Sequence, residues 1–243
     1  MRAAESVVQI RRGDVTATLM LGDCFDLAAG LPAFNCVISD PPFSERTHKG
    51  HDAAVKAVNE TGNDATERRD LGYEFWGAEH IEQFCAAFNP DGWMVVINDH
   101  SNFPLFDREM RKRGRYVFAP LPSFTSGRSV RLAGDGPASW TDWICVSRTK
   151  KQSKWGSLCG GYINKQVEGG RRMGGKPIGL MLALVRDYSR AGDTVLDPCM
   201  GAGTTGLACI MAGRNFIGIE RDEATFQMAV ARIQREANQG TLL

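Results

Sequence analysis

Short apolar runs alternate with segments of helical periodicity along most of the chain. Residues 7–10 and 15–21 have the composition of β-strands and are joined by the turn-like Arg-Arg-Gly-Asp. The C-terminal part is the most regular, because short apolar strands there alternate with amphipathic helices. This alternation predicts an α/β protein with a doubly wound sheet. The other expected strands are 35–39, 93–98, 115–119, 141–147, 194–197 and 215–219, and the expected helices are 78–88, 103–113, 177–190, 204–213 and 222–238.

Two stretches depart from this alternation. Residues 44–72 are polar with weak periodicity, which predicts a mobile loop or a partly ordered helix. Residues 148–175 are basic and rich in glycine, and a Gly/Ser/Arg-rich connection fills 123–139. With 243 residues, 43% of them apolar, the chain is long enough for one full core. We therefore expect a single domain, 1–243, with a mobile loop at about 44–72 and a small accessory region at about 123–175.

Charge and cysteine usage indicate the setting of the protein. Lys and Arg total 29 against 28 Asp and Glu, which gives a formal charge of +1. The net charge of the chain therefore does not indicate a nucleic-acid partner. The seven cysteines form no C-x-x-C pair and lie in apolar segments, which indicates reduced thiols in a cytoplasmic protein. His48 and His51 have a metal-like spacing without supporting ligands, so no metal is expected. Without a long apolar run, neither export nor a membrane span is expected.

The first informative motif is Asp40-Pro41-Pro42-Phe43. The apolar strand that contains Cys36, Val37 and Ile38 stops there abruptly, since two consecutive prolines exclude both a central strand and a normal helix start. A carboxylate, stiff backbone carbonyls and an aromatic ring then follow one another at the tip of a strand. This combination suits a flat molecule that carries an amino group. Taken alone, Asp40 could also be a turn or cap residue and Phe43 a core aromatic.

The second motif spans 194–222, TVLDPCMGAGTTGLACIMAGRNFIGIERD. A strand ends at Asp197, a glycine turn leads into a helix, and the next strand ends at Glu220. Gly201 and Gly203 allow the backbone to turn tightly and to approach a ligand closely. Glu220 falls at the tip of the adjacent strand, where a carboxylate can bind two ribose hydroxyls. The alternative is an ordinary strand–turn–helix without a ligand.

Gly201-Ala-Gly203-Thr-Thr-Gly206 also satisfies the dinucleotide fingerprint G-x-G-x-x-G. That interpretation fits poorly, because too little chain remains after this unit to build a second nucleotide-binding half. Asp197, just before the turn, is moreover an unfavourable neighbour for a pyrophosphate. It suits a cationic ligand instead, such as a nucleoside with a sulfonium and an α-amino group.

With both motifs in view, the chain resembles the beta class of amino DNA methyltransferases. Asp40-Pro41-Pro42-Phe43 looks like their catalytic D/N/S-P-P-Y/F motif, and the segment from Asp197 to Thr205 looks like their S-adenosylmethionine turn. The catalytic motif precedes the cofactor motif, which is the circularly permuted order of this class. The resemblance covers about 15–43, 90–98, 140–150 and 175–235, including Gly22-Asp23-Cys24 and Gly175-Lys176-Pro177. One departure is that Arg172-Met-Gly-Gly175 replaces the H-P-T-Q that usually precedes Lys-Pro.

The resemblance implies a Rossmann-like, mostly parallel sheet with an antiparallel strand. It also implies a separate role for each motif residue. Asp40 and the Pro41 carbonyl would accept the hydrogens of a base amino group, while Pro42 keeps the loop stiff. The Phe43 ring would stack on a base flipped out of the duplex. For cofactor binding the resemblance implies Asp23, Cys24, Asp40, Lys176, Asp197, Pro198, Gly201, Gly203, Thr204, Thr205 and Glu220. Among these, Glu220 would bind the ribose, Asp23 and Cys24 the adenine edge, and Thr204, Thr205 and Lys176 the methionine carboxylate.

A DNA-binding surface would have to come from local charge. Between residues 128 and 176 the chain has ten Lys and Arg against three acids, with Trp and Tyr interleaved. Such a run suits phosphates and unstacked bases, although a basic run can also be a solvated face. The accessory region at about 123–175 would then recognise the target sequence, and the loop at 44–72 would close over the base or wedge the duplex. The expected DNA-binding residues are Arg46, His48, Lys49, Arg128, Arg131, Lys150, Lys151, Lys154, Arg171 and Arg172.

The sequence thus predicts a site-specific DNA methyltransferase of a restriction-modification type that uses S-adenosylmethionine on double-stranded DNA. Asp in the tetrapeptide favours adenine N6, because cytosine-N4 enzymes of this kind more often have Ser there. Cytosine N4 is the nearest alternative, and protein-amide or RNA methylation is more distant. A catalytically inactive DNA-binding protein with this fold is an alternative of another class. A homodimer is possible, and the expected setting is the cytoplasm of a bacterial or phage-infected cell.

Overall fold

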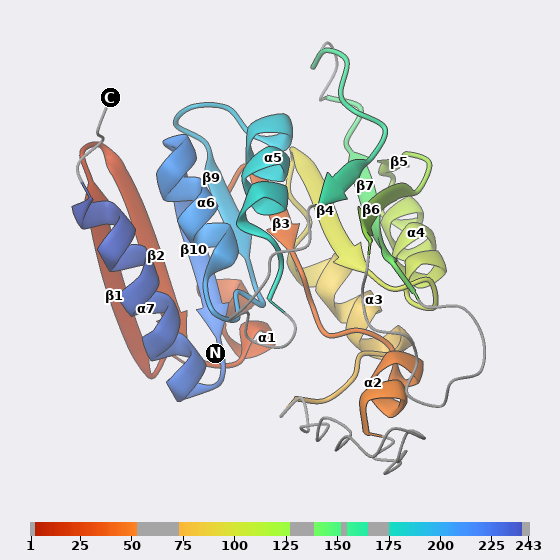
Figure 1. Cartoon of the computed structure of the whole chain (residues 1–243), viewed down its shortest axis with the longest axis horizontal. Coiled ribbons are helices and arrows are strands. Elements are labelled where there is room, and N and C mark those ends of the chain that lie inside the picture. The colour runs from red at the N-terminus through yellow and green to blue at the C-terminus, as the bar shows by residue number, and fades with distance from the viewer. Residues whose placement is uncertain (1–2, 53–72, 127–138, 152–154, 165–174, 240–243) are drawn as a thin grey trace, which may run out of the picture.

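The alternating pattern folds into one mixed sheet with helices on both faces (Figure 1). The computed structural model describes residues 3–52, 73–126, 139–151, 155–164 and 175–239, and the side chains of 49–52 are not described. In this part of the chain the sheet order is β1-β2-β10-β9-β3-β4-β7-β6-β8, with β5 paired to β7. The strands are β1 Ser6–Arg12, β2 Val15–Leu21, β3 Cys36–Ser39, β4 Trp93–Asn98, β5 Tyr116–Val117, β6 Leu121–Thr125, β7 Thr141–Arg148, β8 Tyr162–Asn164, β9 Thr194–Asp197 and β10 Asn215–Glu220.

The helices form two layers that enclose the sheet. Helices α5, α6 and α7 cover one face, and α3 and α4 cover the other (Figure 1). Residues of a central strand alternate between the two cores, so Ile38 packs with the first layer and Val37 with the second. The helices are α1 Cys24–Leu27, α2 Glu45–Asp52, α3 Ala78–Ala87, α4 Phe103–Lys112, α5 Ile178–Tyr188, α6 Thr204–Ala212 and α7 Glu223–Asn238, with a 3₁₀ turn at Ala28–Gly30.

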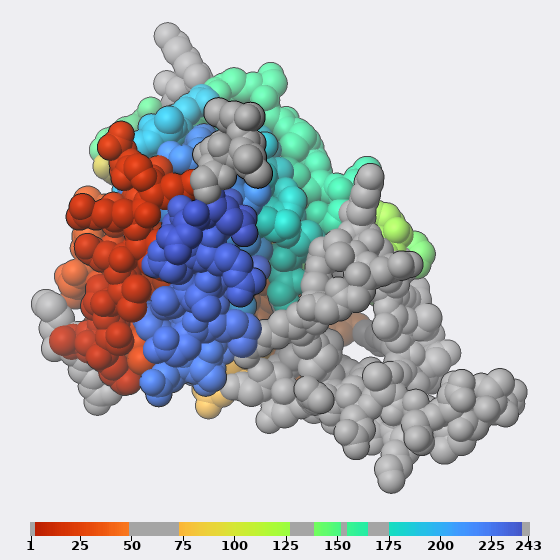
Figure 2. Space-filling model, turned by 60° about the vertical axis from the view of Figure 1, so that its left-hand side comes forward, coloured from red at the N-terminus to blue at the C-terminus, as the bar shows by residue number. Residues whose placement is uncertain are grey.

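The C-terminal helix packs beside the N-terminal hairpin. Figure 2 shows α7 next to the strands at the start of the chain, and its buried side chains include Phe226, Ala229 and Ile233. Arg12 of β1 forms an ion pair of 3.4 Å with Glu236 at the end of the helix. The two ends of the chain thereby complete one core. None of the described helices is long and apolar enough to cross a membrane.

The predicted doubly wound fold is confirmed, with two refinements. Both β1 and β7 run antiparallel to the other strands, so the sheet has one more antiparallel strand than expected. Strand β8 lies inside the region at 123–175 that was expected to be mostly loop, and strand β6 ends within it. The sequence pattern did not predict β6, because this strand contains Pro122. It did not predict β8, because this strand is only three residues long. Helix α2 occupies the start of the predicted loop at 44–72.

The parallel strands place an acid at the end of each. Strands β2, β10, β9, β3 and β4 lie side by side in the same direction, so their last residues share one edge of the sheet. We call this the carboxyl edge. The acids at or just after these strand ends are Asp23, Glu220, Asp197, Asp40 and Asp99. Because ligands of open α/β sheets bind at this edge, the fold itself points to a site there.

Candidate functional site

The two sequence motifs lie side by side at the carboxyl edge. Strand β3, which leads into Asp40, pairs in parallel with β9, which leads into the glycine turn. The hydroxyl of Ser39 donates a hydrogen bond of 2.7 Å to Oδ1 of Asp197, across 158 positions of sequence. The motifs are therefore joined directly, as the resemblance required.

Asp197 is the central acceptor of the glycine turn. Its Oδ1 also accepts a 3.1 Å bond from the Cys199 backbone N–H, and its Oδ2 accepts a 2.6 Å bond from the Thr205 hydroxyl. Only 1% of Asp197 is exposed, and burial raises its pKa to about 6 although three hydrogen bonds favour the ionised form. Asp197 and Thr205 were both expected to face the cofactor. In this geometry they bind each other and fix the shape of the turn.

The turn depends on glycine at two positions. Gly201 and Gly203 have φ of +52° and +76°, a left-handed conformation that other residues rarely adopt. A Cβ on Gly203 would lie 2.9 Å from Cβ of Ala229 in α7, whereas a Cβ on Gly201 would meet nothing within 4 Å. Gly203 therefore allows α6 to pack against α7, and Gly201 leaves the open side of the turn bare. A bare backbone next to a helix start is suited to close approach by a ligand.

Glu220 and the Asp23 loop lie next to this turn. The Gly22 N–H donates to the Glu220 carbonyl at 2.9 Å, which ties the end of β2 to the end of β10. Burial raises the pKa of the Glu220 carboxyl, and its Oε1 accepts a 2.9 Å bond from the Asp222 N–H. Asp23 caps α1 through bonds to the backbone of the next turn, and Cys24 is buried. A half-buried carboxylate beside a bare glycine turn fits the ribose and polar groups of a nucleoside.

Asp40 forms an ion pair with Lys176. The Lys176 Nζ lies 3.0 Å from Asp40 Oδ1, 3.5 Å from Asp142 Oδ2 and 4.5 Å from the centre of the Phe43 ring. The contact is an ion pair between the Lys176 ammonium and the Asp40 carboxylate. Oδ1 is covered, while 22% of the Asp40 side chain stays exposed, and burial of the carboxylate raises its pKa to about 6 despite the ammonium. Lys176, which was expected to contact the carboxylate end of the cofactor, thus contacts the catalytic motif.

Asp99, at the end of β4, anchors the loop after Phe43. Its Oδ2 accepts a 3.0 Å bond from the Ser44 N–H and bonds from the hydroxyls of Ser44 and Thr47, at the start of α2. Burial acts to raise the pKa of Asp99, but these hydrogen bonds outweigh it and lower the pKa. The Trp76 N–H donates to the Phe43 carbonyl at 3.0 Å. The loop is therefore fastened from two sides.

Sequence reasoning missed three residues of this site, namely Ser39, Asp99 and Asp142. The acid directly after the buried strand 93–98 was a signal that could have identified Asp99. Nothing in the sequence marked Asp142, because β7 runs antiparallel and brings its first residues, not its last, to the carboxyl edge.

The expected DNA-binding residues are scattered. Arg46 is exposed on α2 at the carboxyl edge, but His48 is only 6% exposed and lies edge-on to the Tyr73 ring. Lys150 and Lys151 are exposed after β7, at the opposite edge of the sheet, where Lys151 lies 3.7 Å from Asp91. The DNA-binding surface proposed below does not include Lys150 and Lys151, because they lie at the opposite edge, or His48, because it is buried. The side chains of Lys49, Arg128, Arg131, Lys154, Arg171 and Arg172 lie outside the described residues.

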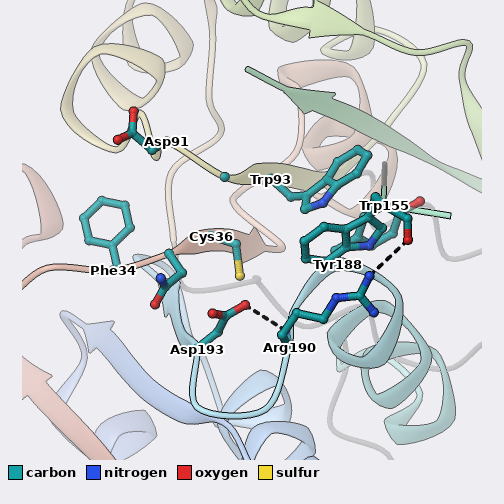
Figure 3. A pocket seen from close by; sticks show the side chains of 10 residues that line it. Phe34, Cys36, Asp91, Trp93, Trp155, Tyr188, Arg190 and Asp193 are labelled. Carbon is teal, nitrogen blue, oxygen red and sulfur yellow. Dashed lines mark hydrogen bonds between the residues drawn. The ribbon is translucent and has the colours of Figure 1, made fainter. Parts of the chain in front are cut away.

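One cavity among the described residues lies away from the motifs. It has a volume of about 280 Å³ and lies at the amino ends of β3 and β4 (Figure 3). Trp93, Trp155 and Tyr188 line it, with Arg190 stacked 4.1 Å from the Trp155 ring. No residue of either motif contributes to it, so the chemistry is assigned to the open carboxyl edge. Within the described ranges no group of three or more His, Cys, Asp or Glu side chains could hold a metal ion.

Comparisons with known proteins agree with the motifs. The family model described as DNA methylase matches residues 139–231. The Type II methyltransferase M.HinfI of Haemophilus influenzae is 36% identical over 254 residues, covering 91% of this chain and 69% of that protein. The M1.HpyAVI–SAM complex has a TM-score of 0.66 at 23% identity, covering 89% of this chain and 99% of that one. The cytosine-N4-specific PvuII DNA methyltransferase has a TM-score of 0.64 at 15% identity, covering 96% and 89%.

The structural neighbours share the fold, and the relative from Haemophilus extends the likeness to the sequence of most of the chain. The paired motifs at the carboxyl edge agree with both findings. This chain belongs to the N6/N4 family of DNA methyltransferases.

Proposed function

We propose that the protein transfers a methyl group from S-adenosylmethionine to the N6 amino group of adenine at a specific site in double-stranded DNA. The observation that carries this proposal is the junction of β3 and β9. There the Asp40 loop and the glycine turn emerge from adjacent parallel strands and are tied by the bond from Ser39 to Asp197.

The reaction requires activation of a poor nucleophile. The lone pair of an exocyclic amine is delocalised into the base, and hydrogen-bond acceptors that hold both amino hydrogens localise it on nitrogen. We assign this role to Asp40 and the Pro41 carbonyl, with Pro42 restricting the loop and Phe43 stacking on the flipped base. Orientation of this kind contributes up to about 7–11 kcal/mol in well-positioned systems. The fastening of the loop by Asp99 and Trp76 supports this assignment.

The cofactor side is assigned to the turn and its neighbours. When bound, S-adenosylmethionine supplies the methyl group from its sulfonium. Glu220 would hold the ribose hydroxyls, and Asp23 with Cys24 would border the adenine. The backbone from Pro198 to Gly203 and the start of α6 at Thr204 would hold the methionine end. The mutual bonds of Asp197 and Thr205 favour an indirect role for both, through the shape of the turn.

The DNA side rests on fewer described residues. We assign Arg46, which is exposed on the helix that follows the catalytic loop, to contacts with phosphates near the target base. We propose one domain for residues 1–243. The expected roles of 123–175 in target recognition and of 44–72 in covering the base stay predictions, because residues 53–72, 127–138, 152–154 and 165–174 lie outside the described part of the chain. Phosphate contacts imply that binding weakens steeply with added salt.

Cytosine N4 is the second candidate, because the fold is shared with a cytosine-N4-specific enzyme at a similar TM-score. Asp40 favours adenine, since Ser is the commoner residue at this position of N4 enzymes. Sequencing that detects methylated bases in DNA from cells that express the protein would identify base and site together. N6-methyladenine at one sequence is expected, and N4-methylcytosine would replace the first proposal by the second.

Asp40→Ala tests the catalytic assignment on purified protein. The variant should bind S-adenosylmethionine like the wild type, measured by calorimetry, and lose methyl transfer by orders of magnitude. Near-normal turnover would remove Asp40 from the mechanism, and absence of transfer by the wild type to any DNA would contradict the proposed function as a whole.

A further inference from the structure

Asp142 is a buried acid that the proposed reaction does not use. It lies at the start of β7, in a chain segment far from both motifs, and only 9% of its side chain is exposed. Its Oδ2 lies 3.5 Å from the ammonium of Lys176. A buried carboxylate is costly unless it is paired, so this acid is held at the site by a specific contact.

Lys176 joins Asp142 to the catalytic motif. Its side chain is 12% exposed, and the ammonium lies between Asp142 and Asp40 and over the face of Phe43. Lysine is a compact charge on a flexible stem, so a single partner would leave it several positions. Two carboxylates and a ring restrict it to one position against Asp40 Oδ1.

In that position the ammonium favours the ionised form of Asp40. The carboxyl must be ionised to accept a hydrogen from the base, while its burial favours the neutral acid. Among the described residues, the charged groups that face it are Lys176, Asp142 and Asp197, and of these only Lys176 favours the ionised form. With Oδ1 covered by the ammonium, the exposed part of the carboxylate is left for the target amino group.

We propose that Asp142 is a positioning residue that holds Lys176 against Asp40 Oδ1, so that Asp40 stays ionised and oriented toward the base. The inference rests on the proposed catalytic role of Asp40. It gives Lys176 a role in the chemistry in place of cofactor binding.

The two possible effects of Asp142 on Asp40 have opposite signs. As a nearby negative charge, Asp142 raises the pKa of Asp40, so its neutralisation alone would lower that pKa. As the anchor of Lys176, Asp142 keeps the ammonium in place, so its neutralisation would release the ammonium and raise the pKa of Asp40. The pH dependence of methyl transfer therefore shows whether Asp142 acts by holding Lys176 or only as a nearby negative charge.

The experiment compares single-turnover rates of methyl transfer between pH 5 and 9 for the wild type, Asp142→Asn and Lys176→Met. We expect both variants to lose at least tenfold in rate near neutral pH and to need a higher pH for half-maximal rate. The affinity for S-adenosylmethionine should change less than threefold, and the double variant should be no slower than Lys176→Met alone. Asp91→Asn, an exposed acid at the opposite edge, should match the wild type.

An Asp142→Asn variant with the wild-type rate, or with a half-maximal rate at lower pH, would overturn the inference. A large loss of cofactor affinity in Lys176→Met would return this lysine to the cofactor site and overturn it as well. Asp142→Ser repeats the test with a smaller polar residue if circular dichroism shows that the Asn variant is unfolded. An active Asp40→Ala would instead refute the proposed function on which the inference rests, so the two failures can be told apart.

Discussion

The hydroxyl of Ser39 donates a 2.7 Å hydrogen bond to Oδ1 of Asp197 and so connects the catalytic strand to the cofactor turn. Both residues are almost fully buried, and both lie at the ends of neighbouring parallel strands. Neither is expected to touch the base, yet together they set the separation of the two loops. In the proposed reaction, the distance between the nucleophile and the methyl donor would therefore depend on this buried contact behind the site.

Removal of this contact should weaken both the fold and cofactor binding. Ser39→Ala leaves a buried carboxylate with one donor fewer, which costs about 1–3 kcal/mol of unfolding free energy. Because the turn loses a fixed point, the affinity for S-adenosylmethionine should fall several-fold. Denaturant unfolding and calorimetry measure the two effects.

Ser123→Ala is the matched control. Ser123 is equally buried, and its hydroxyl accepts a 2.9 Å bond from the Asn164 side chain; Ser123 lies in β6, which β3, β4 and β7 separate from the strand of Asp197. It should lose stability without a change in cofactor affinity. Equal losses of affinity in both variants would show that the effect is one of general stability.

Gly203→Ala should lower the unfolding free energy by more than the left-handed backbone conformation at this position alone would cost. A left-handed residue with a side chain costs about 1–2 kcal/mol. The new Cβ would also lie 2.9 Å from Ala229, and overpacking adds about 1–3 kcal/mol. Gly213→Ala is the control, because its φ is +70° and its Cβ would meet nothing within 4 Å. Unfolding free energies that are equal for the two variants would refute the packing argument.

The rate of methyl transfer should depend on the ionisation of Asp40. Burial raises its pKa to about 6, and an acid is ionised only above its pKa. The single-turnover rate should therefore be constant at high pH and fall as the pH decreases through about 6. Asp40→Asn, which has no titrating group, should be slow and should lack this decline. If Asp40→Asn shows the same decline as the wild type, the decline comes from the titration of another group.

Arg46 should contribute to DNA binding through a phosphate. Arg46→Ala is expected to weaken binding of any duplex and to reduce the slope of log affinity against log salt by about 1. Lys150→Ala serves as the control, since Lys150 is exposed at the opposite edge of the sheet. Fluorescence anisotropy over a range of salt concentrations measures both. A larger effect at Lys150 would place the DNA on the other edge.

The sequence by itself determined the elements and the order of the motifs. Helices such as Ala78–Ala87 and Glu223–Asn238 and the buried strand Trp93–Asn98 follow from periodicity, because apolar spacing reflects the local backbone. The ends of the strands at Ser39 and Asp197 were also predictable, since proline and glycine act within a few residues. The family resemblance needed only these local patterns.

Only the tertiary structure decided which side chains meet. Asp197 was expected to face the cofactor, but Ser39 and Thr205 surround it. Lys176 was expected at the cofactor from its motif, and only the fold shows that its ammonium also lies between Asp40 and Asp142. These contacts join segments that are far apart in the chain, and their geometry follows from strand order and direction. Spacing along a sequence carries no record of either, because the sheet forms only when distant strands pair.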